Sequence, residues 1–89
     1  MDAYIINYDL RNPGRDYRSL YAELRTYPVR SHPLESTWMV RSNETAVQIR
    51  DRLVKHMDAN DGLLVVKSAN VAAWRGLSDE ISKWLKEYV

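Results

Sequence analysis

The chain begins with an apolar run that favours a β-strand and carries one carboxylate near its end. This run is Ala3-Tyr4-Ile5-Ile6-Asn7-Tyr8-Asp9-Leu10, and its isoleucines and tyrosines suit a pleated, half-buried surface. Alternate residues of a strand point to opposite faces, which separates a more apolar set from a set that holds Asn7 and Asp9. The apolar set is expected to face the core, which leaves Asp9 on the open face of a central strand.

Asp9 needs an explanation, because a short carboxylate competes for backbone hydrogen bonds and is depleted from strands. One interpretation is that Asp9 begins a turn with Arg11-Asn12-Pro13-Gly14, which are residues that favour turns. The other interpretation is a metal or nucleic-acid site at the end of the strand. Both interpretations remain open at the level of the sequence.

Helical and strand periodicities alternate along the rest of the chain. The expected elements are a helix that begins near Tyr17 and ends before Pro28, an edge strand over 29–34, a strand over 36–41, a helix capped by Ser42 or Asn43, a strand over 63–68 and a last helix capped by Ser78 or Asp79. In the second helix, Ala46, Ile49, Leu53 and Met57 form the apolar stripe, supported by Val47 and Val54.

This order of elements predicts an α+β fold of the ferredoxin-like type, βαββαβ, with a four-stranded antiparallel sheet and two helices on one face. A length of 89 residues allows one domain, 1–89, with a core over 3–68 and a C-terminal helical extension over 71–89. Because both core helices cover one face, the other face is expected to be solvated, covered by the last helix or buried in a partner.

Composition narrows the functional classes. There is no cysteine, which excludes disulfides and thiolate zinc sites, and no apolar run is long enough to cross a bilayer. A cytoplasmic protein that does not enter membranes is therefore expected. The net charge is only +1, yet six arginines and only three acidic residues lie between Arg11 and Arg41, so the first half is locally cationic.

The histidines and aromatic residues have ordinary explanations. His32 and His56 lack the spacing of a metal-binding pair on a helix. Most of the tyrosines and tryptophans fall on apolar helical faces, although aromatic rings interleaved with basic residues also occur in single-strand binders. Trp38 is expected in the core or an interface rather than as a platform for a base.

The sequence resembles a known superfamily. A first strand ending in Tyr8-Asp9-Leu10, an arginine-bearing loop after it and the strand Ser36-Thr37-Trp38-Met39-Val40 are similar to the smaller CRISPR adaptation subunit and to its VapD-type toxin relatives. The likeness covers roughly residues 3 to 68. The Tyr-Asp-Leu, Ser-Thr-Trp and Lys-Trp-Leu patterns resemble small proteins labelled SinR family more closely.

The resemblance implies a homodimer in which the strand-end aspartates lie near the two-fold axis. Some members of the superfamily are metal-dependent nucleases, whereas others only scaffold nucleic acid. By this resemblance, Asp9 is expected to be the catalytic residue and the ligand of Mg²⁺ or Mn²⁺. Asn7 and Tyr8 are expected to support it as neighbouring polar groups. A single carboxylate per chain is enough for a metal only if two copies share the ion.

The predicted function is therefore that of a homodimeric protein that binds RNA or DNA. If the protein is an enzyme, the predicted activity is that of a metal-dependent endonuclease. The expected phosphate contacts are Arg11, Arg15, Arg18 and Arg41, because guanidinium groups pair well with phosphate. The alternative is a non-enzymatic module that binds another protein through the open sheet face. The balanced net charge favours this alternative.

Overall fold

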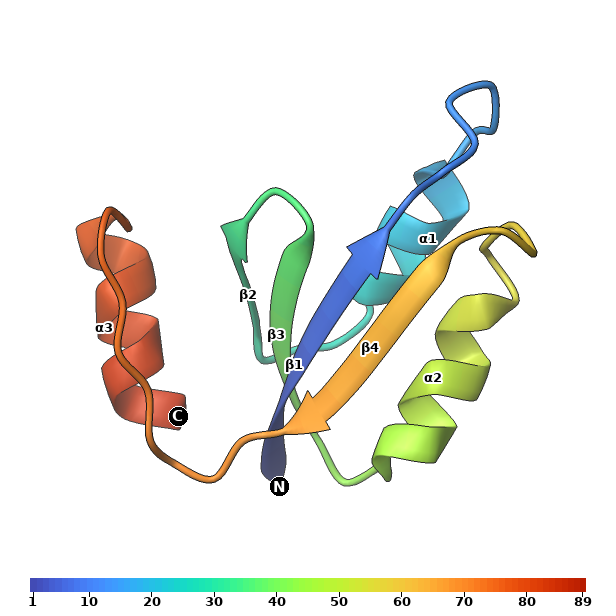
Figure 1. Ribbon diagram of the computed structural model, residues 1–89. Helices are drawn as coiled ribbons and strands as arrows, with labels where there is room; N and C mark the ends of the chain where they lie inside the picture. The colour runs from blue at the N-terminus through green and yellow to red at the C-terminus, as the bar shows by residue number, and fades with distance from the viewer.

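The computed structural model describes all residues from 1 to 89 and shows a small α+β protein. Its elements are β1 (Asp2–Asp9), α1 (Arg18–Leu24), β2 (Arg30–Leu34), β3 (Thr37–Ser42), α2 (Ala46–Val54), β4 (Gly62–Lys67) and α3 (Asp79–Tyr88). The strands form one antiparallel sheet in the order β2-β3-β1-β4. Helices α1 and α2 cover one face, and α3 stands apart from them beside β2 (Figure 1). None of the helices has the length and hydropathy that a membrane crossing requires.

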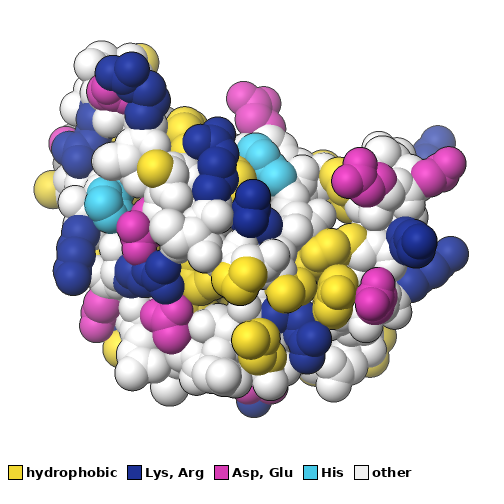
Figure 2. All heavy atoms as spheres, turned by 180° about the vertical axis from the view of Figure 1, so that it is seen from behind, with side chains coloured by type: hydrophobic (Ala, Val, Ile, Leu, Met, Phe, Trp, Pro, Cys, Tyr) yellow, Lys and Arg dark blue, Asp and Glu magenta, His cyan; other side chains and the backbone are white.

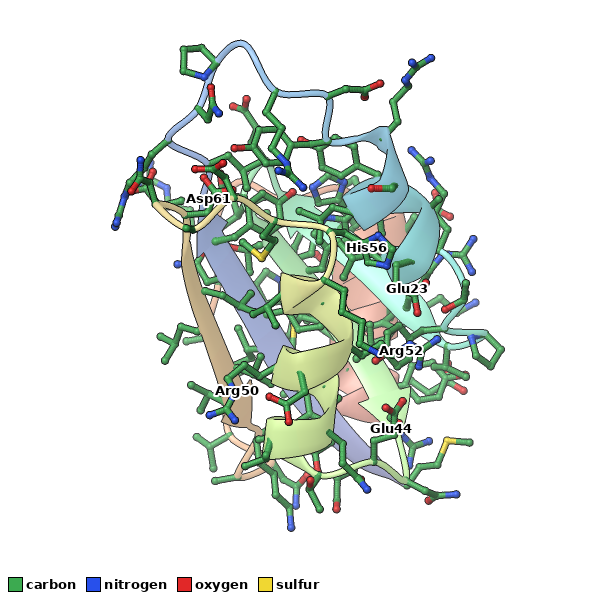
Figure 3. The ribbon with its side chains drawn as sticks, turned by 90° about the vertical axis from the view of Figure 1, so that its right-hand side faces the viewer. Glu23, Glu44, Arg50, Arg52, His56 and Asp61 are labelled. Atoms are coloured by element: carbon green, nitrogen blue, oxygen red, sulfur yellow. The ribbon has the colours of Figure 1, made fainter.

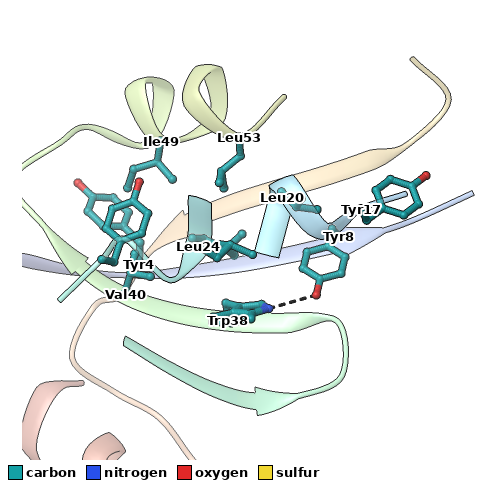
Figure 4. Packing of buried hydrophobic residues seen from close by; sticks show 11 residues of the cluster. Tyr4, Tyr8, Tyr17, Leu20, Leu24, Trp38, Val40, Ile49 and Leu53 are labelled. Atoms are coloured by element: carbon teal, nitrogen blue, oxygen red, sulfur yellow. Dashed lines mark hydrogen bonds between the residues drawn. The ribbon is translucent and has the colours of Figure 1, made fainter. Parts of the chain in front are cut away.

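The main core lies between the sheet and the pair α1 and α2. Its fully buried side chains come from both layers: Ile6, Leu20, Leu24, Val40, Ile49 and Leu53 (Figure 4). In β1, Tyr4 and Tyr8 join Ile6 in this core, whereas Asn7 and Asp9 are exposed. The predicted assignment of the two faces of the first strand is confirmed.

Two buried aromatic side chains fix the β2–β3 hairpin to β1. The indole Nε1 of Trp38 donates a hydrogen bond of 3.1 Å to the Tyr8 hydroxyl, which in turn donates to the carbonyl of Glu35 at 3.2 Å (Figure 4). Burial raises the pKa of Tyr8. The Trp38 N–H and the Tyr8 hydroxyl are therefore both hydrogen-bonded, as buried polar groups in proteins generally are. Trp38 is a core residue, as expected.

An arginine of α2 links the two core helices through charge. The guanidinium of Arg52 pairs with Glu23 of α1 and, at 2.7 Å, with Glu44, and it lies 4.5 Å from the centre of the Tyr27 ring (Figure 3). The hydrogen bond from Arg52 lowers the pKa of Glu23. These groups are only partly exposed, so solvent screens their attraction less than it screens a surface pair.

The start of α2 differs from the prediction. Thr45, rather than Ser42 or Asn43, is the N-cap, and it forms a capping box with Gln48. Ser42 still belongs to β3, and its hydroxyl accepts a hydrogen bond from the Glu44 N–H instead. The N-cap therefore lies three residues after Ser42 and two residues after Asn43.

Two valines of α2 were expected to support its buried stripe, and that expectation is wrong. Val47 is 54% exposed and Val54 is 45% exposed. The stripe that faces the sheet contains Ile49 and Leu53. Val47 lies two residues before Ile49 and Val54 one residue after Leu53, and at these spacings a helix turns a side chain away from the stripe. Both valines therefore lie on the outer surface.

The C-terminal segment covers part of the second sheet face. Ala3 and Met39 point to that face and are buried, and so is Leu85, the only buried residue of α3. Beneath the segment lies a mostly apolar cavity of about 420 Å³, bordered by Ile5 and Met39 of the sheet and by Trp74 before α3. Of the three outcomes expected for this face, partial cover by the last helix is the one observed.

Candidate nucleic-acid interface

Asp9 lies at the end of β1 in contact with its own turn. Its carboxylate pairs with the Arg11 guanidinium at 3.0 Å, and its side chain is 70% exposed. The Arg11 N–H donates to Asp61 at 2.7 Å, and its guanidinium donates to the carbonyl of Asn60 at 3.0 Å. Asp9 and Arg11 thus tie the end of β1 to the turn before β4, which supports the turn interpretation of Asp9.

Asp61 is hydrogen-bonded to more residues than any other acid of this region. It accepts hydrogen bonds from the Tyr17 hydroxyl and from the N–H groups of Arg11 and Asp58. Desolvation opposes its ionisation, yet these hydrogen bonds and the nearby positive charge lower the pKa of Asp61. Gly62 follows it, and a Cβ there would lie 3.0 Å from the Arg11 guanidinium. A glycine at this point lets the arginine pass across the strand.

A divalent ion at Asp9 finds few ligands within one chain. No three carboxylates, histidines or cysteines are grouped anywhere in residues 1–89. The amide oxygen of Asn7 accepts a hydrogen bond from Thr37, and Tyr8 points into the core, on the face opposite Asp9. One carboxylate already held by Arg11 does not fit a metal centre within one chain. Binding of Mg²⁺ or Mn²⁺ at Asp9 stays a prediction that requires a second copy.

Three of the four predicted phosphate-binding arginines are paired with carboxylates. Arg11 pairs with Asp9, Arg15 lies 3.8 Å from Asp58, and Arg18 lies 2.6 Å from Asp16. The hydrogen bonds from Arg18 lower the pKa of Asp16 to about 2. A local carboxylate offsets the charge of each arginine, so the potential offered to a phosphate is weakened.

Arg41 lies at the other end of the sheet. It is opposite Ala3 in the β1–β3 register, and six residues of extended chain between Ala3 and Asp9 span roughly 20 Å. Its guanidinium donates to the carbonyl of Met1 and lies 5.2 Å from the centre of the Tyr88 ring of α3. The four predicted arginines therefore do not form one continuous patch.

A different basic site lies at the outer edge of β2. A cavity of about 400 Å³ opens between this edge and α3. Its lining residues are Arg25, Arg30, Ser31, His32, Trp38, Ser78, Glu80, Ile81 and Trp84. We call this cavity the β2 groove. In Figure 2, basic side chains gather in the middle of the face shown, beside a histidine and next to hydrophobic side chains.

The two arginines of the β2 groove have no carboxylate partner. Arg25 follows the last turn of α1 and forms no ion pair. Arg30 donates only to the carbonyl of Tyr27, at 2.9 Å, which leaves its charge uncompensated. Glu80 is the single acid among the lining residues. The groove therefore carries net positive charge.

His32 supplies an aromatic surface next to these charges. Its ring stacks on the buried indole of Trp38 with a centroid distance of 4.1 Å and an interplanar angle of 15°. Its Nε2 lies 2.9 Å from the carbonyl of Glu35, and a carbonyl only accepts, so Nε2 is the donor. Because Trp38 takes one face of an exposed imidazole, the other face is available to a ligand.

Sequence reasoning missed this site. It counted Arg25 and Arg30 in the basic first half but chose the arginines adjacent to Asp9 and the strand arginine Arg41. The available signal was the spacing of Arg30 and His32, two residues apart in a predicted strand and so on one face.

No protein-family model matches the chain, and no solved structure shows a significant match to it.

Proposed function

We propose that the protein binds single-stranded nucleic acid in the β2 groove. Phosphates lie against Arg25 and Arg30, and one base stacks on the outward face of His32. The observation that carries this proposal is the juxtaposition of two arginines without carboxylate partners and an exposed ring held in place by Trp38.

The groove suits a single strand better than a duplex. A base that stacks on a protein ring must first leave its own stack, which costs little in a single strand. The groove also offers hydrophobic surface from Ile81 and Trp84 of α3, next to the position proposed for the base. Cationic and aromatic groups side by side are the usual means by which proteins hold single strands without reading their sequence.

The proposal keeps the predicted ferredoxin-like fold, which the order of elements and the sheet order support. It also keeps the nucleic-acid class that the family resemblance implies, but moves the contacts from the Asp9 turn to β2. Kinship with the CRISPR adaptation subunit and VapD-type proteins and a nuclease centred on Asp9 remain predictions. A groove complete within one chain does not depend on them.

The predicted alternative is a protein-interaction module on the open sheet face. Less of that face is exposed than this alternative requires. The segment after β4 already packs over Ala3 and Met39. Exposed apolar side chains remain on this face mainly along β4, where Leu64 is 59% and Val66 is 42% exposed. That strip is narrow compared with the whole face that the alternative assumed.

The proposal is tested by comparing two double variants that each remove two positive charges. Arg25→Ala with Arg30→Ala removes both arginines of the β2 groove, and Arg11→Ala with Arg18→Ala removes two arginines near Asp9. Affinity for a labelled single-stranded RNA and DNA of mixed sequence is measured across a salt series. Loss of two phosphate contacts is expected to reduce the slope of log affinity against log salt by about 1.4 in the first variant.

The second double variant is the matched control, because its arginines are also exposed but paired with acids. It is expected to bind as the unmodified protein does. Equal losses in both variants would indicate non-specific attraction, and a loss only in the second would return the site to the Asp9 turn. Either result contradicts the proposal.

A further inference from the structure

His32 is the only lining residue of the β2 groove that belongs to the type of side chain that ordinarily changes charge between about pH 5 and 8. The other lining residues are two arginines, a glutamate, two serines and three apolar residues. The second histidine of the chain, His56, follows α2 and lies 3.7 Å from Glu23, away from the groove (Figure 3). A change of pH within this range therefore alters the charge of the groove at one residue.

The hydrogen bond of His32 determines where a second proton binds. Nε2 donates to the carbonyl of Glu35, so this nitrogen carries the hydrogen of the neutral ring. Nδ1 has no hydrogen-bond partner in the protein, and the residue is exposed. Protonation of Nδ1 therefore breaks no contact, and it creates a second N–H donor on a ring that borders the groove.

The stack on Trp38 suits the charged ring as well as the neutral one. A cation within about 6 Å of the centre of an indole is attracted to its face, and the two ring centres here are 4.1 Å apart. The hydrogen bond from Nε2 is also kept, because Nε2 is a donor in both forms of the ring. Protonation therefore adds a charge beside the groove without moving the platform.

The charges around His32 differ between the free and the occupied groove. Arg30 lies on the same strand, Arg25 follows α1, and Glu80 of α3 is the one acid of the lining, while Glu35 lies in the turn after β2. In the free groove, the net positive lining opposes a further positive charge on the ring. A bound phosphate offsets the two arginines and attracts the imidazolium directly. Occupancy by a phosphate therefore favours the charged form of His32.

We infer that His32 takes up a proton when nucleic acid enters the β2 groove, so that affinity rises as the pH falls from about 8 to about 5.5. The inference rests on the proposed function and adds its regulation by pH. One proton moves from the solvent to Nδ1 for each groove that is filled. The added N–H donates to a phosphate oxygen, and the charged ring attracts the face of the stacked base.

The test measures affinity by fluorescence anisotropy at about pH 5.5 and 8 and at constant ionic strength. The probe is a labelled oligothymidylate without a terminal phosphate, because thymine does not titrate in this range. The unmodified protein is expected to bind about 3- to 30-fold more tightly at the lower pH, the size of one exposed charge pair with one cation–π contact. His56→Gln is the matched control and should behave in the same way.

His32→Phe keeps the stacking ring but cannot be charged. It is expected to bind with the same affinity at both pH values, close to that of the unmodified protein at about pH 8. The slope of log affinity against log salt for the unmodified protein should also be larger by about 0.7 at the lower pH, because one more cation meets the strand. His32→Phe should show no such change in slope.

Calorimetric titration in two buffers of different ionisation enthalpy counts the protons taken up on binding. Uptake is expected in the unmodified protein and in His56→Gln but not in His32→Phe. Binding without uptake and with equal affinity at both pH values overturns the inference and leaves the proposed function standing, because Arg25 and Arg30 are charged throughout. A pH effect that persists in His32→Phe also overturns it, and no binding at either pH overturns both.

Discussion

The imidazole of His32 is stacked on the indole of Trp38, with 4.1 Å between the ring centres. Trp38 is itself immobilised in the core by its hydrogen bond to Tyr8. An exposed ring is thereby held by a buried one, so a base that stacks on His32 does not have to order a free side chain. Rigid support of this kind lowers the entropic cost of binding.

Replacing the ring of His32 tests whether it is a stacking platform. His32→Ala is expected to weaken single-strand binding by about 5- to 150-fold, because stacking of a base on an aromatic ring is worth about 1 to 3 kcal/mol. His32→Phe keeps an aromatic face and is expected to retain most of the affinity. Fluorescence anisotropy of a labelled oligonucleotide measures both. Equal losses in the two variants would show that the ring acts through polar contacts instead.

The hydrogen bond between Trp38 and Tyr8 is expected to stabilise the fold measurably. Tyr8→Phe leaves the buried Trp38 Nε1–H without its acceptor, so the free energy of unfolding should fall by about 1 to 3 kcal/mol. Tyr88→Phe is the control, because the Tyr88 hydroxyl has no hydrogen-bond partner in the protein and its ring still lies by Arg41. Urea unfolding compares the two. Equal stabilities would contradict this role of the hydrogen bond.

The pair formed by Glu23 and Arg52 should make stability depend on pH. The folded-state pKa of Glu23 is lowered, so its contribution is fully present above the ordinary value of 4.5 and is lost as the pH falls through the lowered value. Glu23→Gln is expected to cost about 1 to 2 kcal/mol at neutral pH and progressively less in acid.

The matched control for that experiment is Asp51→Asn. Asp51 pairs with Arg50, but both side chains are more than half exposed, so a loss within about 0.5 kcal/mol is expected. Urea unfolding of both variants at several pH values gives the comparison. A cost of Glu23→Gln that does not change with pH would show that packing, rather than charge, stabilises this contact.

Asp9→Asn separates the binding proposal from the predicted nuclease. Asp9 does not line the β2 groove and its carboxylate is held by Arg11, so single-strand affinity is expected to stay within twofold. Labelled RNA and DNA are incubated with the protein and Mg²⁺, Mn²⁺ or EDTA to record binding and cleavage together. Metal-dependent cleavage that is lost in Asp9→Asn would establish the enzymatic prediction, and a large loss of affinity would contradict the placement of the site.

Local patterns in the sequence predicted most of the fold. The alternation of β1, the apolar stripe of α2 and the Ser78 cap of α3 are all seen, because each depends on neighbours within a few residues. The cap of α2 was misplaced because Ser42, Asn43 and Thr45 are all good caps. Only the last of them has a glutamine three residues later, and that glutamine completes the capping box.

The candidate site was harder to predict because it depends on contacts between distant segments. Arg11, Arg15 and Arg18 are close to Asp9 in the sequence, but the carboxylates that neutralise them are set by the turns and the tertiary structure. Arg25 and His32 come from different elements, and α3 completes their groove from the far end of the chain. No sequence periodicity reports such a juxtaposition.

The most direct test of the β2 groove is a titration of ¹⁵N-labelled protein with a short single-stranded oligonucleotide, followed by NMR. The account predicts that the largest shifts fall on the side-chain N–H signals of Trp84, Arg25 and Arg30 and on the backbone of His32. Signals from Arg11 and Arg18 should move little. Shifts confined to the turn between Asp9 and Arg18, with Trp84 and His32 unchanged, would contradict the account.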